Sequence, residues 1–208
     1  MKINEIIRAL DKLIPNPCCE LNYKKDYELL IAVMLSAQCT DKRVNIVTGK
    51  LFSRYSLKDL AEIPIYELQD CIKSLGSYTK KAYYIKEISK SLLDNYNGSV
   101  PCDRKYLESL PGVGRKTASV VLSELFNIPN IAVDTHVFRV AWRLGFSEKS
   151  DSVLLVEKKL EKLFSKNIQN RINHQLLLFG RYYCTAKSPK CNNCPFSKIC
   201  HEKNSLLK

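Results

Sequence analysis

The sequence predicts an all-α protein, and three observations support this expectation. Apolar residues recur at intervals of three and four along nearly the whole chain, which is typical of helices with one buried face. Pro64, Pro101, Pro111 and Pro129 fall between these periodic segments, where helix breakers belong. No alternation of apolar and polar residues is long enough to indicate a sheet.

The expected helices follow one another in ordinary lengths. The first carries the stripe Ile3, Ile6, Ile7 and Leu10, and the second is strongly apolar. In chain order the expected segments after the first are 27–35, 41–52, 65–75, 80–93, a helix opening near 115, 137–144, 153–164 and 168–183. Asp134 and Asp151 precede two of them, and we expect both to act as N-caps.

The segment 110–116, LPGVGRK, is the most informative part of the chain. Gly112 and Gly114 can take a positive φ and let another backbone approach closely. The apolar stripe that follows predicts a helix, whose positive N-terminal end favours a phosphate and disfavours the charged form of Lys116. Lys116 lies near the edge of that stripe, so partial burial is expected. A tight turn followed by a solvated Arg115–Lys116 pair is the alternative interpretation.

Composition limits the class of protein. The chain has 208 residues, 45% of them hydrophobic, which suits one large domain or two small lobes. The formal net charge of +12 indicates a polyanionic partner, unless the lysines serve only solubility. The longest apolar run, 29–35, is far short of the roughly 20 residues of a membrane helix. Lys2, Glu5 and Arg8 interrupt the region where a signal peptide needs an apolar core, so a cytoplasmic protein is expected.

The cysteines fall into two groups. Cys184, Cys191, Cys194 and Cys200 form the pattern C-x6-C-x2-C-x5-C. One short C-x2-C knuckle with longer arms suits a loop around a [4Fe–4S] cluster, although the spacing alone also allows zinc or free thiols. Five scattered cysteines are interpreted as core or surface thiols rather than disulfides: Cys18, Cys19, Cys39, Cys71 and Cys102.

Four segments resemble one known family. The segment 110–118 (LPGVGRKTA) resembles the helix–hairpin–helix of the endonuclease III group of DNA glycosylases. Similarly, 131–140 (IAVDTHVFRV) resembles its segment with the essential aspartate, and 35–41 (LSAQCTD) its glutamine-bearing loop. The last four cysteines resemble its iron–sulfur loop. These matches occur in the family's order and span residues 21–200.

The resemblance implies a two-lobed helix–hairpin–helix glycosylase fold. A six-helix lobe would run over 21–129, and residues 1–20 and 130–208 would form a helical lobe that ends in the [4Fe–4S] loop. Its cluster would be bound by the four C-terminal cysteines. The family places its active site in the groove between the lobes.

The activity implied is that of a bifunctional DNA glycosylase and AP lyase. Lys116 would attack C1′ of an oxidised pyrimidine nucleotide, and β-elimination would then cleave the strand 3′ to the abasic site during base excision repair. Asp134 would stabilise the positive charge that develops as the base departs, although taken alone it is simply an N-cap. The adenine-mismatch relatives generally lack a lysine at the position of Lys116.

The resemblance also implies a set of DNA contacts. Gln38 would fill the gap left by the extruded nucleotide, and Ser77 stands where the family commonly has a wedging leucine. The expected phosphate contacts are Gly112, Gly114 and Arg115 in the hairpin, and Arg181, Lys187 and Lys190 near the cluster loop. Without the family, these are a loop glutamine and ordinary solvated side chains.

The expected partner is double-stranded DNA that contains damaged pyrimidines or abasic sites, bound by a monomer at the nucleoid. Two alternatives stay open at this point. Lys116 could bind phosphate only, in a monofunctional glycosylase. The chain could also be a non-enzymatic DNA-binding protein that senses redox state through its cluster.

Overall fold

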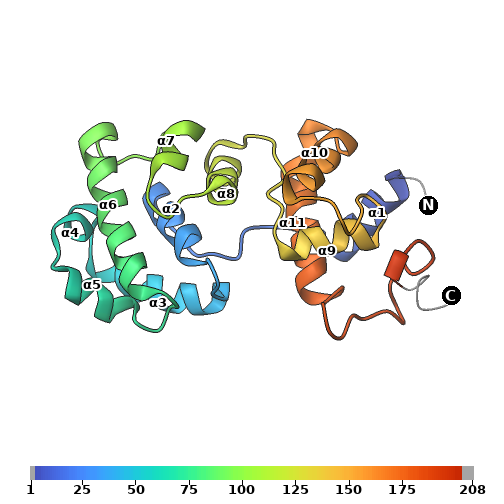
Figure 1. Cartoon of the computed structure of the whole chain (residues 1–208), viewed down its shortest axis with the longest axis horizontal. Helices are drawn as coiled ribbons and strands as arrows, with labels where there is room; N and C mark the ends of the chain where they lie inside the picture. The colour runs from blue at the N-terminus through green and yellow to red at the C-terminus, as the bar shows by residue number, and fades with distance from the viewer. Residues whose placement is uncertain (1–2, 203–208) are drawn as a thin grey trace. The chain divides into compact units, whose positions relative to one another are not determined.

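The computed structural model describes residues 3–202, and this range contains helices and no strand (Figure 1). The expected all-α class is confirmed. The helices are α1 (Ile3–Leu13), α2 (Asp26–Leu35), α3 (Asp41–Arg54), α4 (Leu57–Glu62), α5 (Ile65–Ile72), α6 (Tyr78–Tyr96), α7 (Arg104–Ser109), α8 (Arg115–Phe126), α9 (Thr135–Arg143), α10 (Val153–Leu163) and α11 (Lys166–Tyr182). Within the described range, none of them has the length and apolar content needed to cross a membrane.

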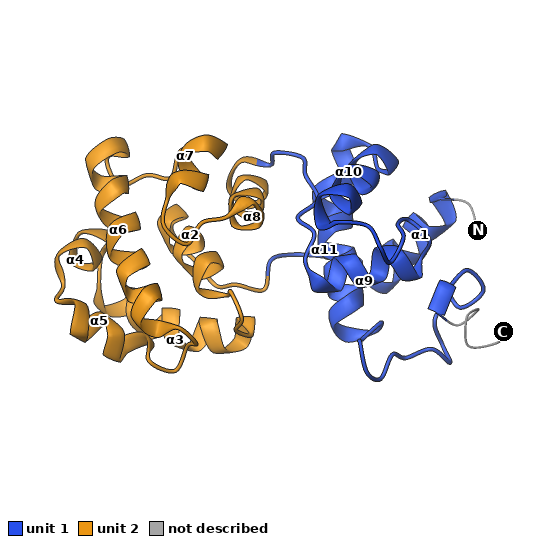
Figure 2. Ribbon diagram, in the orientation of Figure 1, with its two compact units in different colours: residues 1–19, 127–208 blue, residues 20–126 orange. Residues whose placement is uncertain are grey.

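The chain divides into two compact units (Figure 2). Unit 2 is the continuous segment Glu20–Phe126, and unit 1 combines residues 1–19 with 127–208. Unit 2 contains α2 to α8, one helix more than the expected six. The helices α4 and α7 have only 6 residues each, too few for a periodic stripe to reveal them. Their capping residues, Ser56 and Asp103, are the local signals that mark them.

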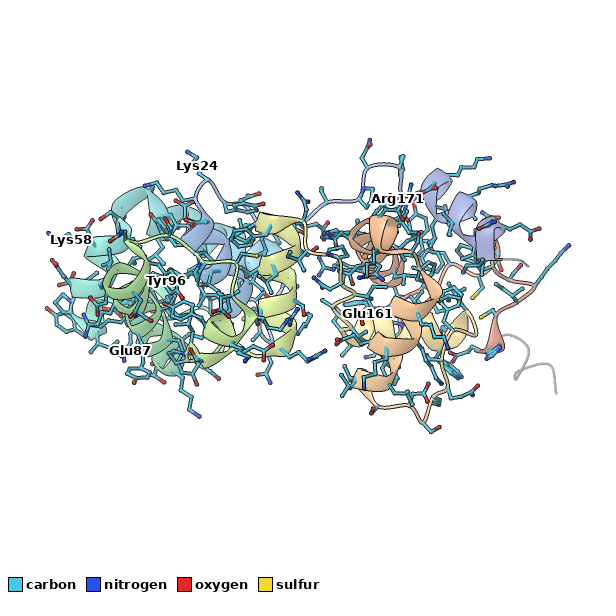
Figure 3. The ribbon with its side chains drawn as sticks, turned by 90° about the horizontal axis from the view of Figure 1, so that it is seen from above. Lys24, Lys58, Glu87, Tyr96, Glu161 and Arg171 are labelled. Carbon is cyan, nitrogen blue, oxygen red and sulfur yellow. The ribbon has the colours of Figure 1, made fainter. Side chains whose placement is uncertain are left out.

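Unit 2 is built around α2, which is buried along almost its whole length. It packs against α3, α6 and α8, so all of its faces need apolar side chains, as the sequence provides. The long helix α6 covers α4 and α5. Near its end, Tyr96, which is labelled in Figure 3, packs on Tyr106 with ring centroids 4.5 Å apart. Helix α8 ends at Phe126, where the expected apolar stripe also ends, and Asn127 after it takes a left-handed conformation (φ 53°).

Unit 1 is built on α9 and α11, with α1 packed on α11 and α10 on α9. Gly180 allows the close approach of α11 to α9, since a Cβ there would lie 2.9 Å from His136 Cβ. Arg171 on α11, visible in Figure 3, pairs with Asp11 on α1 at 2.9 Å. Asp151 is not the N-cap of α10, contrary to expectation. Ser152 takes that position and accepts from the Leu155 N–H.

Candidate functional site

The hairpin between α7 and α8 is held by its own backbone. The Val113 N–H donates to Leu110 O at 3.1 Å and closes the turn. Gly112 has φ +78°, and a Cβ at this position would lie 2.4 Å from the Tyr84 ring. Gly114 has open space around it instead. The two glycines therefore differ: Gly112 is needed for the fold of the hairpin, and Gly114 leaves the surface accessible to a ligand.

Lys116 lies in the first turn of α8, as expected. The first intrahelical bond runs from the Ala118 N–H to Gly114 O at 3.0 Å, so Arg115 and Lys116 stand at the positive end of the helix. The expected partial burial of Lys116 is wrong, because the structure leaves this residue exposed. The buried face of α8 begins only at Ala118, which is fully buried.

Gln38 occupies the tip of the loop between α2 and α3. It is exposed and left-handed, with φ 58°. The loop is short and internally bonded, since the Cys39 N–H donates to Ser36 O at 3.0 Å and Thr40 caps α3. A non-glycine residue in this region of φ is uncommon and often marks a functional position.

Ser77, at the expected wedge position, has the same unusual backbone. It is the N-cap of α6 with φ 57°, and its side chain forms no capping bond. Ser77 is exposed, as is the neighbouring Tyr78. The tips of these two loops are therefore left-handed polar residues with exposed side chains.

Asp134 caps α9, as the sequence predicts. Its Oδ1 accepts from the N–H groups of His136 and Val137, both at 2.8 Å. The apolar residues before it, Ile131 to Val133, are buried, whereas Asp134 itself is half-buried. A carboxylate accepts several hydrogen bonds, so capping leaves it able to act on a nearby positive charge.

The cysteine loop, 184–200, follows α11 and lacks regular helices of its own. Isolated main-chain bonds shape it, among them Cys194 N–H to Cys191 O at 3.2 Å and Lys190 N–H to Tyr183 O at 2.9 Å. Phe196 anchors it in the core of unit 1, where it is 1% exposed and lies edge-on to Phe179 at 5.2 Å.

Two arginines of α9 hold the start of this loop. Arg139 donates to Cys184 O at 3.0 Å and to Gly180 O at 2.7 Å. Arg143, which is 5% exposed, donates to Cys184 Sγ at 3.3 Å and to Thr185 O at 2.9 Å. It also pairs with Glu202 at 2.5 Å. A guanidinium presents several donors in a fixed fork, which suits it to organising carbonyls and a sulfur together.

The donor set fits an iron–sulfur cluster. None of the four cysteines of the loop is in a disulfide, so all four sulfurs can serve as ligands. Burial raises the pKa of the Cys184 thiol, and the hydrogen bond from Arg143 opposes that shift. Burial likewise raises the pKa of Cys194, and the neighbouring sulfurs of Cys184, Cys200 and Cys191 raise it further. Burial and the neighbouring sulfurs therefore disfavour the thiolate form of Cys194, whereas bound iron would favour it.

The expected phosphate contacts of unit 1 lie around this loop. Lys187 is exposed, and Arg181 is half-buried near the end of α11. Lys190 is exposed and its Nζ lies 5.1 Å from the centroid of the Tyr183 ring, a cation–π contact that restrains the side chain.

The predicted site residues are divided between the two units. Unit 2 carries Gln38, Gly112, Gly114, Arg115 and Lys116; unit 1 carries Asp134, Arg181, Lys187, Lys190 and the cysteines of the loop. Sequence reasoning missed Lys81, Arg139 and Arg143. Lys81 and Arg143 each occupy a buried position within an amphipathic helix, and a basic residue on an apolar stripe was the available signal.

Comparisons with known proteins agree with this geometry. A family model described as "HhH-GPD superfamily base excision DNA repair protein" matches residues 31–166. A second model, the iron–sulfur binding domain of endonuclease III, matches residues 184–200. Endonuclease III of Bacillus subtilis is 48% identical over 206 residues, covering 97% of this chain and 94% of its own. This chain belongs to the endonuclease III family.

Other members give the same result. Endonuclease III of Escherichia coli is 43% identical, covering 97% of this chain and 96% of its own. A structure of a trapped endonuclease III–DNA covalent intermediate aligns with a TM-score of 0.93 and 47% identity, and both chains are covered completely. The family expected from the sequence is therefore confirmed, together with the helix–hairpin–helix glycosylase fold and the [4Fe–4S] cluster as cofactor.

Proposed function

We propose that Lys116 and Asp134 carry the reaction of this DNA glycosylase and AP lyase, which removes oxidised pyrimidines in base excision repair. The observation that carries the assignment is the position of Lys116. It is an exposed amine, in the first turn of α8, directly after a glycine hairpin whose open side can receive a DNA backbone. The trapped covalent intermediate belongs to a chain that is 47% identical, which supports amine chemistry of this kind.

The proposed reaction begins when the neutral Lys116 amine attacks C1′ of the extruded nucleotide. The bond from Nζ to C1′ forms, the glycosidic bond breaks, and the base leaves with the electron pair and acquires a proton. Loss of the amine protons and opening of the sugar ring give a Schiff base. A proton then leaves C2′, the C3′–O bond breaks on the 3′ side, and water finally releases the lysine.

Asp134 acts on the charge that this reaction creates. Departure of the base gives the sugar oxocarbenium character, and a fixed carboxylate stabilises such a charge. The two cap bonds from the His136 and Val137 N–H groups hold Asp134 in one orientation. A carboxylate that is already oriented needs little rearrangement when the charge appears.

The cysteine loop serves binding in this proposal. Cys184, Cys191, Cys194 and Cys200 hold the [4Fe–4S] cluster, which supplies a cross-link between distant parts of the loop. That cross-link fixes Lys187 and Lys190 so that they meet the phosphate backbone, with Arg181 beside them. Arg115 and the N–H groups after Gly114 would bind phosphate in the same sequence-independent way.

Borohydride trapping on a duplex with one thymine glycol tests the assignment of Lys116. The wild-type protein should form a covalent protein–DNA band, and Lys116→Gln should abolish it, with excision slowed by about a thousandfold or more. Arg115→Gln is the matched control, because it removes a neighbouring exposed charge and should weaken DNA binding while leaving trapping intact. Trapping that persists in Lys116→Gln would mean that another amine is the nucleophile.

We further propose that the protein acts as a monomer on damaged duplexes and works at the nucleoid. The net charge of +12 supports retention on DNA. Sedimentation of the free protein and of its complex with a single-lesion duplex should give one chain per duplex. A dimer in the complex would contradict this stoichiometry.

A further inference from the structure

Lys81 on α6 is buried, although lysine is rarely found inside proteins. It is 5% exposed, and its Nζ donates to Leu35 O and Ala37 O, both at 2.9 Å. It also donates to Cys39 Sγ at 3.4 Å. A buried ammonium is costly unless its protons are bonded, and here each of its three protons has an acceptor.

These three acceptors surround Gln38 in the chain. Two of them precede it and one follows it, so Lys81 holds the loop on both sides of its tip. Gln38 itself takes the left-handed conformation, with φ 58°. That conformation costs free energy in a residue with a Cβ and persists only where the surroundings enforce it. The bonds from Lys81 to the loop provide such enforcement.

Lys81 lies in the first turn of α6, directly after the second loop. Its main-chain N–H makes the first bond of that helix, to Ser77 O at 3.0 Å, so the side chain ties the Gln38 loop to the start of α6. A second link joins the same two regions, since Arg43 at the start of α3 donates to Ser74 O at 3.2 Å. All of these residues belong to unit 2.

We propose that Lys81 is a positioning residue whose side chain fixes the Gln38 loop against the start of α6, so that Gln38 meets the duplex in one orientation. The inference rests on the proposed function, in which Gln38 fills the gap left by the extruded nucleotide. A gap-filling side chain must enter the duplex at one place and in one orientation. A displacement of its loop by about an ångström would weaken gap filling considerably.

The alternative role for Lys81 is purely structural. Leu35 ends α2, and an ammonium near the carbonyls of a helix C-terminus is favourable in any helical protein. In that case its loss would lower stability and affect every substrate alike. The positioning role predicts instead an effect that depends on Gln38 and on the base opposite the lesion.

The test compares Lys81→Met with Lys86→Met in single-turnover excision of thymine glycol opposite adenine. Lys86 lies on the same helix, and its Nζ donates to Ile63 O at 2.5 Å, away from both loop tips. Lys86→Met therefore removes the same kind of bond. Lys81→Met should slow excision by about tenfold or more, and Lys86→Met should stay near the wild-type rate. Equal rates for the two variants would overturn the inference.

A double-mutant cycle separates positioning from general damage. In a Gln38→Ala background, Lys81→Met should add no further loss, because the group it positions is gone. A duplex with an abasic site opposite the lesion should likewise remove the difference between Lys81→Met and wild type. If the rate losses of the two single variants multiply in the double variant, Lys81 acts structurally and the proposal is refuted.

Two further outcomes are distinguishable. If Gln38→Ala excises at the wild-type rate, the gap-filling part of the proposed function fails, whatever Lys81 does. If Lys81→Met does not give the wild-type circular dichroism and melting temperature, the same cycle is run with Lys81→Leu, which also removes every side-chain donor. Persistence of the wild-type rate in that variant with Gln38 present would also overturn the inference.

Discussion

The hairpin at 110–114 and the cysteine loop at 184–200 are both short irregular segments, yet they are stabilised in different ways. In the hairpin, Gly112 packs against Tyr84 and the chain bonds to itself before α8 begins. In the cysteine loop, main-chain bonds are scattered, and two arginines of α9 provide much of the support. The first segment is built by the chain alone, whereas we expect the second to depend on its cofactor.

Removing a cluster ligand should give the largest effect and test that contrast directly. Cys194→Ser should lose the visible absorbance of the cluster and destabilise unit 1, because structural metal sites contribute binding free energy of about 10 kcal/mol to folding. Hydrogen exchange should quicken over 184–200 and leave the amides of the hairpin as protected as before. Cys102→Ser, at an exposed position, is the control. An equal loss of protection in the hairpin would contradict the conclusion that only the cysteine loop depends on the cluster.

The glycines of the hairpin provide the second test. Gly112→Ala places a Cβ 2.4 Å from the Tyr84 ring in a residue with φ +78°, so we expect a loss of about 1–3 kcal/mol in the free energy of unfolding. Gly114→Ala meets nothing within 4 Å and should melt like wild type. The methyl group added by Gly114→Ala would meet the expected phosphate, and Gly112→Ala would distort the same hairpin. DNA affinity should therefore fall in both variants. Chemical denaturation and a binding titration measure the two effects separately.

Asp134 shows a third way of fixing a segment, because a helix cap orients a group that we propose to be reactive. Asparagine caps a helix about as well as aspartate but lacks the charge, so Asp134→Asn should keep its stability and lose excision. Asp134→Ala should lose both, with about 1 kcal/mol of unfolding free energy removed. Thermal melts measure the loss of stability in each variant, and single-turnover rates measure the loss of excision. If both variants excise normally, Asp134 is only a cap.

The smallest effect concerns the loop before α10. The hydrogen bond from Lys159 at 2.6 Å and that from the Glu148 N–H at 2.8 Å hold the pKa of Asp151 below its ordinary value of 3.8. A carboxyl with a lowered folded pKa stabilises the protein above pH 3.8, and this contribution disappears as the pH falls through the folded pKa. Asp151→Asn should therefore melt slightly lower at neutral pH, and the difference should vanish in acid.

The sequence predicted well wherever a local pattern controls the structure. The stripe after Gly114 placed Lys116 in the first turn of α8, and Asp134 is the cap that its position indicated. Asp151 failed as a cap because Ser152 stands nearer to the helix, and a carboxylate can also close a loop. The helices α4 and α7 are too short to show a period.

Local sequence patterns do not predict contacts between segments that are far apart in the chain. Lys81 bonds to carbonyls that lie 46 and 44 residues away, and Arg143 reaches a sulfur 41 residues away. Only the fold creates those neighbours. The exposure of Lys116 was missed for a related reason, since a stripe indicates which face is buried but not where along the helix burial begins.

The side-chain bonds from Lys81 to the Gln38 loop end on main-chain oxygens at Leu35 and Ala37, apart from the contact with Cys39. Backbone acceptors are present whatever side chain a tip residue carries. The support under the Gln38 loop can therefore stay constant while the residue at its tip is exchanged. Preference for one opposite base over another can then evolve, or be engineered, by single replacements that leave the rest of the unit untouched.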